Sequence, residues 1–427
     1  MGSGYHAVVA DRPARTTLQE AAYPVMNTEP RRRLGPILLL ASFAGSVAGA
    51  VANPHEPAPC VPVGGWVTPN AAGTDAITTA ELVERAAAAG AVLLGESHDS
   101  SEHHRWQLQT LIAIYADHPE MVIALEMFPR SAQPALDRWV AGEIGETEFL
   151  DSSRWHEVWR FEPDLYMPIF HFARMNRIPL LAVNVDRSFT RAVAENGFAA
   201  VPPEDREGIG VPAPASDAYE DMLLESWRTH RPENESPEAA DGDSAEFRRF
   251  VESQLVWDRA MAQGIADAKQ RWPGAIVAAL MGSGHVIHGW GVSHQLQMMG
   301  QPAPLKLLPW DSDWNCADLV IGYADALFGI ARPPPAPPVD KPLLGIGIRP
   351  ADDGVLISDV VSASIAAQTG LHTGDVIIEI AGRRPAQPRD VAAAVARQAP
   401  GTWLPLTIRR DGQTLEFVAK FPPAAKP

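Results

Sequence analysis

Ala91-Val-Leu-Leu-Gly-Glu-Ser-His-Asp-Ser-Ser-Glu-His-His (residues 91–104) is the stretch from which both the fold and a candidate site can be predicted. Its opening apolar run is typical of a buried strand. Asp99 can cap a following helix, with Glu102 at the third helical position completing a capping box. We therefore expect Glu96 and His98 to lie on the turn between a strand and a helix, where open α/β sheets bind ligands.

Three further apolar runs are followed by polar side chains in the same way, and helical stretches separate them. This alternation predicts the α/β class, with a mainly parallel sheet flanked by helices and the carboxyl ends of its strands at one edge. Residues 146–171 are predicted to form short helices dense in aromatic residues. The runs and the polar residues after them are 121–125 with Glu126, 178–183 with Asn184, Asp186 and Arg187, and 275–281 with Gly282-Ser-Gly-His285.

If these strands are neighbours, two imidazoles and two carboxylates converge on one cleft. Neutral imidazoles with carboxylates suit a divalent metal, for which His98, Glu126 and His285 are the candidate ligands. The same set could act as general acid and base without a metal. The expected cleft residues are Glu96, His98, Glu126 and His285, with Asp99, Asn184, Arg187 and Asp258 around them.

Each of these residues also has a structural explanation. Glu96 and His98 could be capping groups. Glu126 could be the buried ion-pair partner of Arg187 or Arg259, and His285 could begin a helix. The remaining residues of interest are more typical of packing or surface positions than of a binding site: His103, His104, His288, His294, and the aromatic group Trp155, Trp159 and Tyr166.

Length and composition limit the class of protein. The chain has 427 residues, 46% of them hydrophobic, which allows two or three domains with a sizeable core. Its net charge of −17 argues against nucleic-acid binding, because phosphate contacts need clustered Lys and Arg. The two cysteines, Cys60 and Cys316, allow one disulfide at most.

The N-terminal region is typical of a leader. Three arginines at 31–33 precede an apolar run at 34–50, and Ala50-Val-Ala fits a signal-peptidase pattern, so we expect a leader at 1–52. Met26 is an alternative start, and an uncleaved membrane anchor is an alternative to cleavage. No lipid-attachment pattern precedes Cys60, so we expect a soluble periplasmic protein with an extended lead-in at 53–78.

The C-terminal region has a different character. A proline-rich linker is expected at 331–342. Residues 343–427 contain short β-like runs around two short helical stretches, which predicts a small, separate β-rich domain. The polar, acidic segment 196–245 that precedes the long helix of the first domain is expected to be a partly disordered excursion.

Four motifs in the first domain, expected at 79–330, resemble the ChaN-like haem-binding uptake family. This family is grouped with Tiki metalloproteases, TraB and erythromycin esterases. The resemblance implies that the sheet carries a helical accessory subdomain, and it implies haem binding in iron acquisition, often at a homodimer interface. In the hydrolase branches the matching positions serve hydrolysis, and here these are Glu96, His98, Glu126 and His285. The motifs are Leu94-Gly-Glu-Ser-His-Asp, Ala124-Leu-Glu-Met-Phe, Gln254-Leu-Val-Trp-Asp and Met281-Gly-Ser-Gly-His.

The second domain resembles a PDZ domain of the HtrA type, through Leu344-Gly-Ile-Gly and Ala367-Gln-Thr-Gly-Leu-His-Thr-Gly-Asp-Val-Ile. The resemblance implies that an extended peptide binds with its C-terminal carboxylate at the glycine-rich loop. Use of the domain only as a docking spacer is the alternative. The expected peptide-binding residues are Leu344, Gly345, Ile346, Gly347, Val391 and Val395.

These observations support two functions. The first is an exported haem-binding protein of haem and iron uptake, whose PDZ domain recruits a peptide or a protein partner. The second is a hydrolase, metal-dependent or metal-free, that uses the cleft residues. A non-catalytic scaffold is a third reading. The motifs do not identify the residue that would bind the haem iron.

Overall fold

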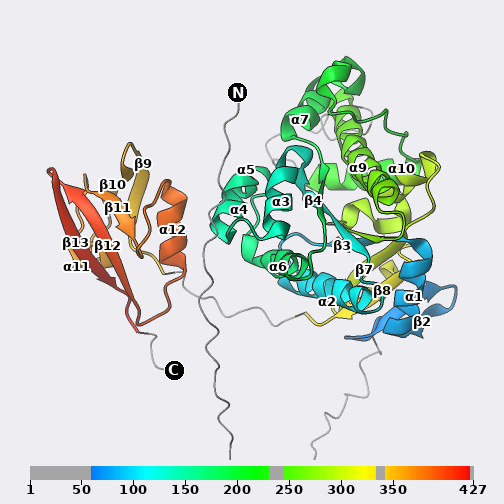
Figure 1. Cartoon of the computed structure of the whole chain (residues 1–427), viewed down its shortest axis with the longest axis horizontal. Helices are drawn as coiled ribbons and strands as arrows, with labels where there is room; N and C mark the ends of the chain where they lie inside the picture. Colours follow the sequence, from blue (N-terminus) through cyan, green and yellow to red (C-terminus); the bar gives the residue numbers. More distant parts are fainter. Residues whose placement is uncertain (1–58, 230–241, 243, 333–341, 424–427) are drawn as a thin grey trace, which may run out of the picture. The chain divides into compact units, whose positions relative to one another are not determined.

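The computed structural model describes residues 59–229, 242, 244–332 and 342–423 (Figure 1). The expected leader at 1–52 lies outside these ranges, and so does most of the expected linker.

The first part is built on an eight-stranded sheet with the order β2-β1-β8-β7-β3-β6-β4-β5. Strands β8 to β5 in this order are parallel, and β1 and β2 are added antiparallel at one edge. The bounds are β1 Trp66–Asn70, β2 Gly73–Ile77, β3 Ala91–Glu96, β4 Met121–Pro129, β5 Leu180–Asn184, β6 Ile276–Gly282, β7 Leu305–Asp311 and β8 Ala326–Ile330.

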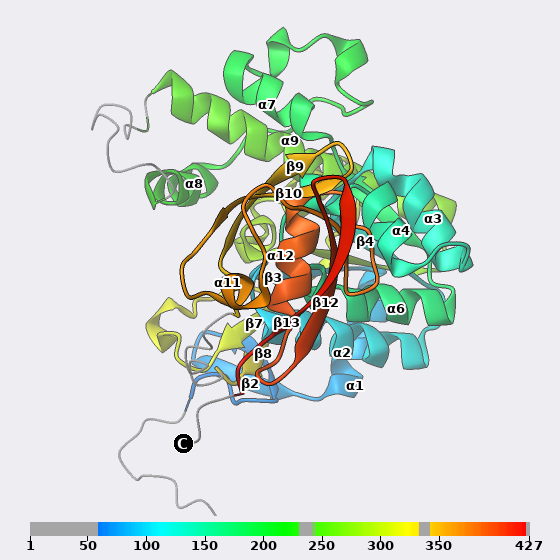
Figure 2. The same cartoon turned by 90° about the vertical axis from the view of Figure 1, so that its left-hand side faces the viewer.

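Helices cover both faces of this sheet, as the alternation of residues along each strand requires. In β3, Val92 and Leu94 pack on one helical layer and Leu93 packs on the other. The first layer contains α1 Thr79–Ala89, α2 Ser101–Asp117, α3 Gln133–Ala141, α4 Glu146–Ser152, α5 Trp155–Val158 and α6 Met167–Asn176. The second contains α9 Ala245–Arg271 and α10 Val292–Met298, with α7 Arg187–Asn196 and α8 Asp217–Thr229 packed on α9 (Figure 2).

The predicted α/β class, with a mainly parallel sheet flanked by helices, is therefore confirmed, and the short helices expected at 146–171 are present as α4, α5 and α6. The expected lead-in at 53–78 needs a correction, because β1 and β2 lie within it and belong to the sheet. Trp66 and Val67 of β1 are buried in the core, whereas β2 at the edge carries mostly exposed residues. The expected excursion at 196–245 contains α8, whose residues Tyr219 and Leu223 are buried.

Cys60 and Cys316 form a disulfide, with Cα atoms 5.7 Å apart. It joins the segment before β1 to the loop after β7. None of the helices in the described ranges has both the length and the apolar character needed to cross a bilayer.

The second part, 342–423, has its own core and a five-stranded antiparallel sheet with the order β13-β12-β11-β10-β9. The small β-rich domain expected from the sequence is thus present. Strand β9 lies at the edge of the sheet, and α12 lies beside it (Figure 1). The bounds are β9 Ile346–Ala351, β10 Gly354–Val360, α11 Ile365–Thr369, β11 Val376–Ile380, α12 Pro388–Ala396, β12 Trp403–Arg410 and β13 Gln413–Lys420.

Candidate functional site

The three central strands β3, β6 and β4 bring the expected cleft residues together. Glu96 at the end of β3 is in register with Gly282 at the end of β6, and β4 pairs with β6 on its other side. A cavity of about 940 Å³ opens at these strand ends. Its lining includes Glu96, His98, Glu126 and His285, so the convergence predicted from separate sequence segments is observed.

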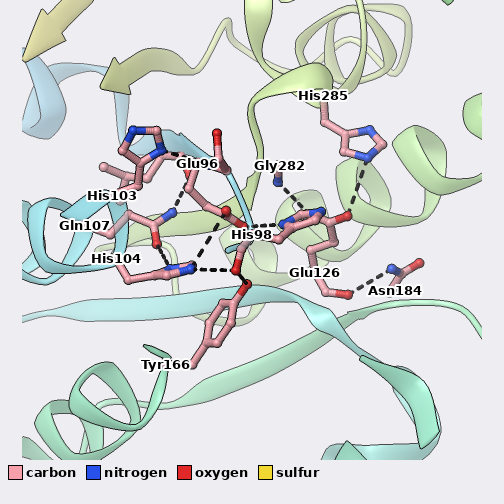
Figure 3. A network of polar contacts seen from close by, with 12 residues as sticks. Glu96, His98, His103, His104, Gln107, Glu126, Tyr166, Asn184, Gly282 and His285 are labelled. Carbon is pink, nitrogen blue, oxygen red and sulfur yellow. Dashed lines mark hydrogen bonds and ion pairs between the residues drawn. The ribbon is translucent and has the colours of Figure 1, made fainter. Parts of the chain in front are cut away.

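Glu96 and His98 form a dyad on the turn after β3. The Nδ1–H of His98 donates to Oε1 of Glu96 over 2.6 Å, which leaves Nε2 without a hydrogen bond among the described residues (Figure 3). The other oxygen of Glu96, Oε2, is buried without a hydrogen bond and lies 4.0 Å from Nε2 of His104. The cap of α2 is Ser100, not Asp99 as expected, and it accepts from the N–H of His103. Glu96 and His98 are therefore free from a capping role.

His285 lies between two carboxylates. Its Nδ1 is 2.7 Å from Oδ1 of Asp258 on α9, and its Nε2 is 3.5 Å from Oε1 of Glu126. The second oxygen of Glu126 accepts the N–H of Gly282 over 2.7 Å (Figure 3). The ion pair of Glu126 with Arg187 or Arg259, considered from the sequence, is replaced by this contact with His285.

The buried charges at this site strongly shift the pKa values of His285 and Glu126. Burial opposes the charged form of His285, but Asp258 and Glu126 outweigh it and raise the pKa of His285 to about 10. Burial likewise opposes ionisation of Glu126, yet the charge and hydrogen bond of His285 lower the pKa of Glu126 to about 2. At neutral pH a cationic imidazole is thus held between two carboxylates.

His98 has a different environment. Its side chain is 31% exposed, and its ring packs against Trp159 and Phe161 at centroid distances of 4.6 and 5.1 Å. Burial opposes protonation, but the hydrogen bond that His98 donates to Glu96 and the charge of Glu126 raise the pKa of His98. The ring is therefore fixed in orientation while one of its nitrogens stays available.

A buried network holds the turn that carries this dyad. Tyr166 donates its hydroxyl to the carbonyl of His98, which also lies 3.2 Å from Nε2 of His104. Gln107 donates to the carbonyl of Leu94 and contacts Nδ1 of His104 (Figure 3). His104 is thus a packing histidine, as expected, and so is His103, which accepts from the N–H of Ser97 and pairs with Asp311. The roles of Gln107 and Tyr166 were not predicted.

Two glycines are required where backbone passes close to the site. A Cβ on Gly282 would lie 2.9 Å from Cε1 of His98. A Cβ on Gly291 would lie 2.7 Å from Oδ1 of Asp258 and 2.8 Å from the carbonyl oxygen of His285. Any side chain at these positions would displace the histidines.

The four residues expected around the cleft divide into three groups. Asn184 and Arg187 line the cavity, and Asn184 also donates to the carbonyl of Glu126. Asp258 is fully buried behind His285 and does not line the cavity. Asp99 is exposed and outside the lining, so its assignment to the cleft is wrong.

One wall of the cavity was not predicted. It comes from α8 and α9. The sequence around α8 predicts a polar excursion and not a wall of the cavity. Trp159, expected to be a packing residue, also lines the cavity, whereas Trp155 and Tyr166 are core residues. The additional apolar and aromatic lining residues are Tyr219, Met222, Leu223, Trp227, Phe250 and Trp257.

The expected metal site is not supported. Within the described ranges, no group of three or more His, Cys, Asp or Glu side chains is arranged to hold a metal ion. The physical reason is that His285 uses both ring nitrogens on carboxylates, and Glu126 uses both oxygens on His285 and Gly282.

The fold and site define an α/β protein with a large, aromatic-lined cavity at the carboxyl end of its central strands. Residues 82–296 match the family model described as "Haem-binding uptake, Tiki superfamily, ChaN", and the chain belongs to this family. Residues 342–420 match the model of the PDZ domain. No curated protein matches the chain.

Solved structures with similar parts include one titled "Cofacial heme binding to ChaN of Campylobacter jejuni". It is 18% identical, has a TM-score of 0.49, and the match covers 62% of this chain and 95% of that one. The PDZ domain of HtrA3, bound to a phage-derived ligand, is 24% identical with a TM-score of 0.17, covering 18% and 82% of the two chains. A serine endoprotease from Yersinia pestis is 26% identical with a TM-score of 0.17, covering 19% and 29%.

Proposed function

We propose that this protein binds haem in the cavity at the carboxyl ends of β3, β6 and β4, and that it serves haem or iron uptake. The family supports haem as the ligand. The observation that carries the location is that His98 lines the cavity while its Nε2 has no hydrogen bond among the described residues. Apolar and aromatic walls around a few fixed polar groups are typical of cofactor sites.

The residues present fit haem. Bound haem would supply an iron that accepts a nitrogen ligand. His98 would provide that nitrogen, since Glu96 fixes its Nδ1–H and such a carboxylate partner orients the ring and increases its basicity. Trp159 and Phe161 would exclude water from one side of the ring. Glu126 and His285 would act as a fixed polar floor.

A haemin titration tests the proposal. We expect a saturable Soret shift at micromolar protein, and we expect His98→Ala to change the position of that band and to weaken binding about tenfold or more, because an iron ligand is lost. His171→Ala is the matched control, because His171 is half exposed and lies outside the cavity lining. A wild-type protein without a Soret shift would reject haem binding, and an unchanged spectrum in His98→Ala would reject only the assigned ligand.

The hydrolase alternative is not favoured. A histidine that serves as a general base must be neutral near the working pH, and His285 is held as a cation by Asp258 and Glu126. In this proposal, His285 is instead part of the rigid and charged floor of the cavity.

For the C-terminal domain we propose peptide binding at the edge of β9. Gly345 has a left-handed backbone, with φ of 79°, in the loop that leads into this strand. Val391 and Val395 on α12 belong to the core against which Ile346 packs. An added peptide strand beside an exposed edge is a common mode of recognition.

Export is also a proposal. The basic and apolar pattern at 1–52 and the A-x-A pattern at its end support it. The disulfide between Cys60 and Cys316 supports an oxidising compartment such as the periplasm, since disulfides rarely persist in the cytosol.

A further inference from the structure

Three arginines lie at one side of the cavity. Arg187 lines the cavity and is the first residue of α7. Arg191 follows one turn later on the same helix, and residues four apart share a face, with Cβ atoms about 5–6 Å apart. The two guanidinium groups therefore project from the same side of α7.

Arg160 approaches the same place from another segment. It stands between Trp159 and Phe161, both of which line the cavity. Its backbone is left-handed, with φ of 73°, a conformation that non-glycine residues rarely adopt. Packing of the two aromatic neighbours around His98 holds this conformation.

This cluster is electrostatically unfavourable by itself. Burial and then the charges of Arg160 and Arg191 lower the pKa of Arg187. A cation in the first turn of a helix is also disfavoured by the helix dipole. The neighbouring acids are used elsewhere, because Arg154 pairs with Glu157 and lies near Asp186, the N-cap of α7.

None of the ion pairs within the described residues includes Arg160, Arg187 or Arg191. Arg187 lines the cavity, and all three side chains are exposed, so their guanidinium groups are accessible to an anion. Arginine clusters favour planar carboxylates, which accept paired N–H bonds from one guanidinium group.

We propose that Arg187, with Arg160 and Arg191, forms a carboxylate-binding subsite of the cavity and takes the propionate groups of haem. The inference rests on the proposed haem site and adds the orientation of the ligand. The macrocycle lies among the aromatic walls, and its charged edge faces α7. The subsite discriminates a porphyrin with free carboxylates from one without them.

The test compares haemin with haemin dimethyl ester, in which both propionates are neutral, on the full chain. The wild-type protein should bind haemin about tenfold or more tightly than the ester, because charge-assisted hydrogen bonds are lost with the ester. Arg187→Ala should lower haemin affinity by a similar factor and leave ester affinity nearly unchanged. The preference of the wild type should also decrease as salt is raised.

Arg105→Ala is the matched control, because Arg105 is exposed on α2 and lies outside the cavity lining. Arg191→Ala provides a second variant if Arg187→Ala fails to fold, and thermal unfolding checks both. Equal wild-type affinity for the two ligands, or equal loss of both in the variants, overturns the subsite while haem binding stands. Failure of both ligands to bind overturns the haem site and this inference together.

Discussion

At the scale of single residues, the contacts of the carboxylates of Asp258 and Glu126 set the charge of the site. Asp258 accepts hydrogen bonds from the hydroxyl of Tyr219 and from Nδ1 of His285, each over 2.7 Å. Glu126 forms an ion pair with Nε2 on the other side of the same ring. Both Asp258 and Glu126 stabilise the protonated ring of His285 that lies between them. The stability of the folded state therefore depends on the protonation of His285.

This dependence predicts a loss of stability at alkaline pH. The pKa of His285 is raised from 6.5 to about 10 on folding, so its contribution is fully present below pH 6.5 and is lost as pH rises towards 10. Asp258→Asn should reduce this alkaline loss and end it at a lower pH, because only the folded-state pKa of His285 falls. Urea unfolding from pH 6 to 10 measures the difference, which we expect to be on the order of a few kcal/mol.

Tyr219→Phe is the control for that experiment, since it removes a hydrogen bond to Asp258 but keeps the carboxylate. Its alkaline profile should remain close to that of the wild type. A flat wild-type profile between pH 6 and 10 would show that His285 is not held as a cation.

Sequence reasoning could find residues at strand ends but not the partners that reach them from elsewhere. Glu96, His98, Glu126 and His285 follow apolar runs, and their position at the carboxyl edge comes from the parallel sheet. Tyr166 contacts the carbonyl of His98 from 68 residues away, a distance across which periodicity carries no information. The sequence predicts the N-cap of α2 at Asp99, one residue before the observed N-cap Ser100, because both residue types are good caps.

At the scale of elements, α8 shows why the cavity itself was not predictable. Its apolar residues are spaced for one buried face, but acidic and proline-rich sequence surrounds them. The buried positions Tyr219 and Leu223 pack against α9, and this contact creates the wall. The wall therefore depends on tertiary packing and not on local propensity.

The edge strand β9 predicts carboxylate-dependent peptide binding. A peptide with a free C-terminus should bind, and its amidated form should bind about tenfold or more weakly. Gly345→Ala should weaken binding further, because its Cβ would lie 2.3 Å from Cβ of Ser364. Fluorescence polarisation with both peptide forms measures these effects.

Gly382→Ala is a matched control for this substitution. Gly382 also has a positive φ, of 75°, but a Cβ there meets nothing within 4 Å. Both variants then carry similar backbone strain, and only the loop before β9 is crowded. Equal effects of the two substitutions would remove the loop from the proposed binding site.

At the scale of the molecule, the disulfide links positions that are 256 residues apart. Closing so long a loop restricts the unfolded chain, and the chain-entropy model assigns about 5 kcal/mol to it. The Cys60→Ser, Cys316→Ser double variant should therefore unfold at lower denaturant than the oxidised protein. Dithiothreitol should shift the wild type to the same midpoint and leave the variant unchanged, and identical midpoints throughout would contradict the prediction.

The same bond makes residues 60–316 a closed covalent ring, and every residue that lines the cavity, from Glu96 to His285, lies within it. A protease that cuts a single peptide bond inside the ring would leave both fragments tethered around the cavity. Such a nicked molecule would migrate as one band without a reductant and as two with it, and it would keep its ligand pocket assembled after cleavage.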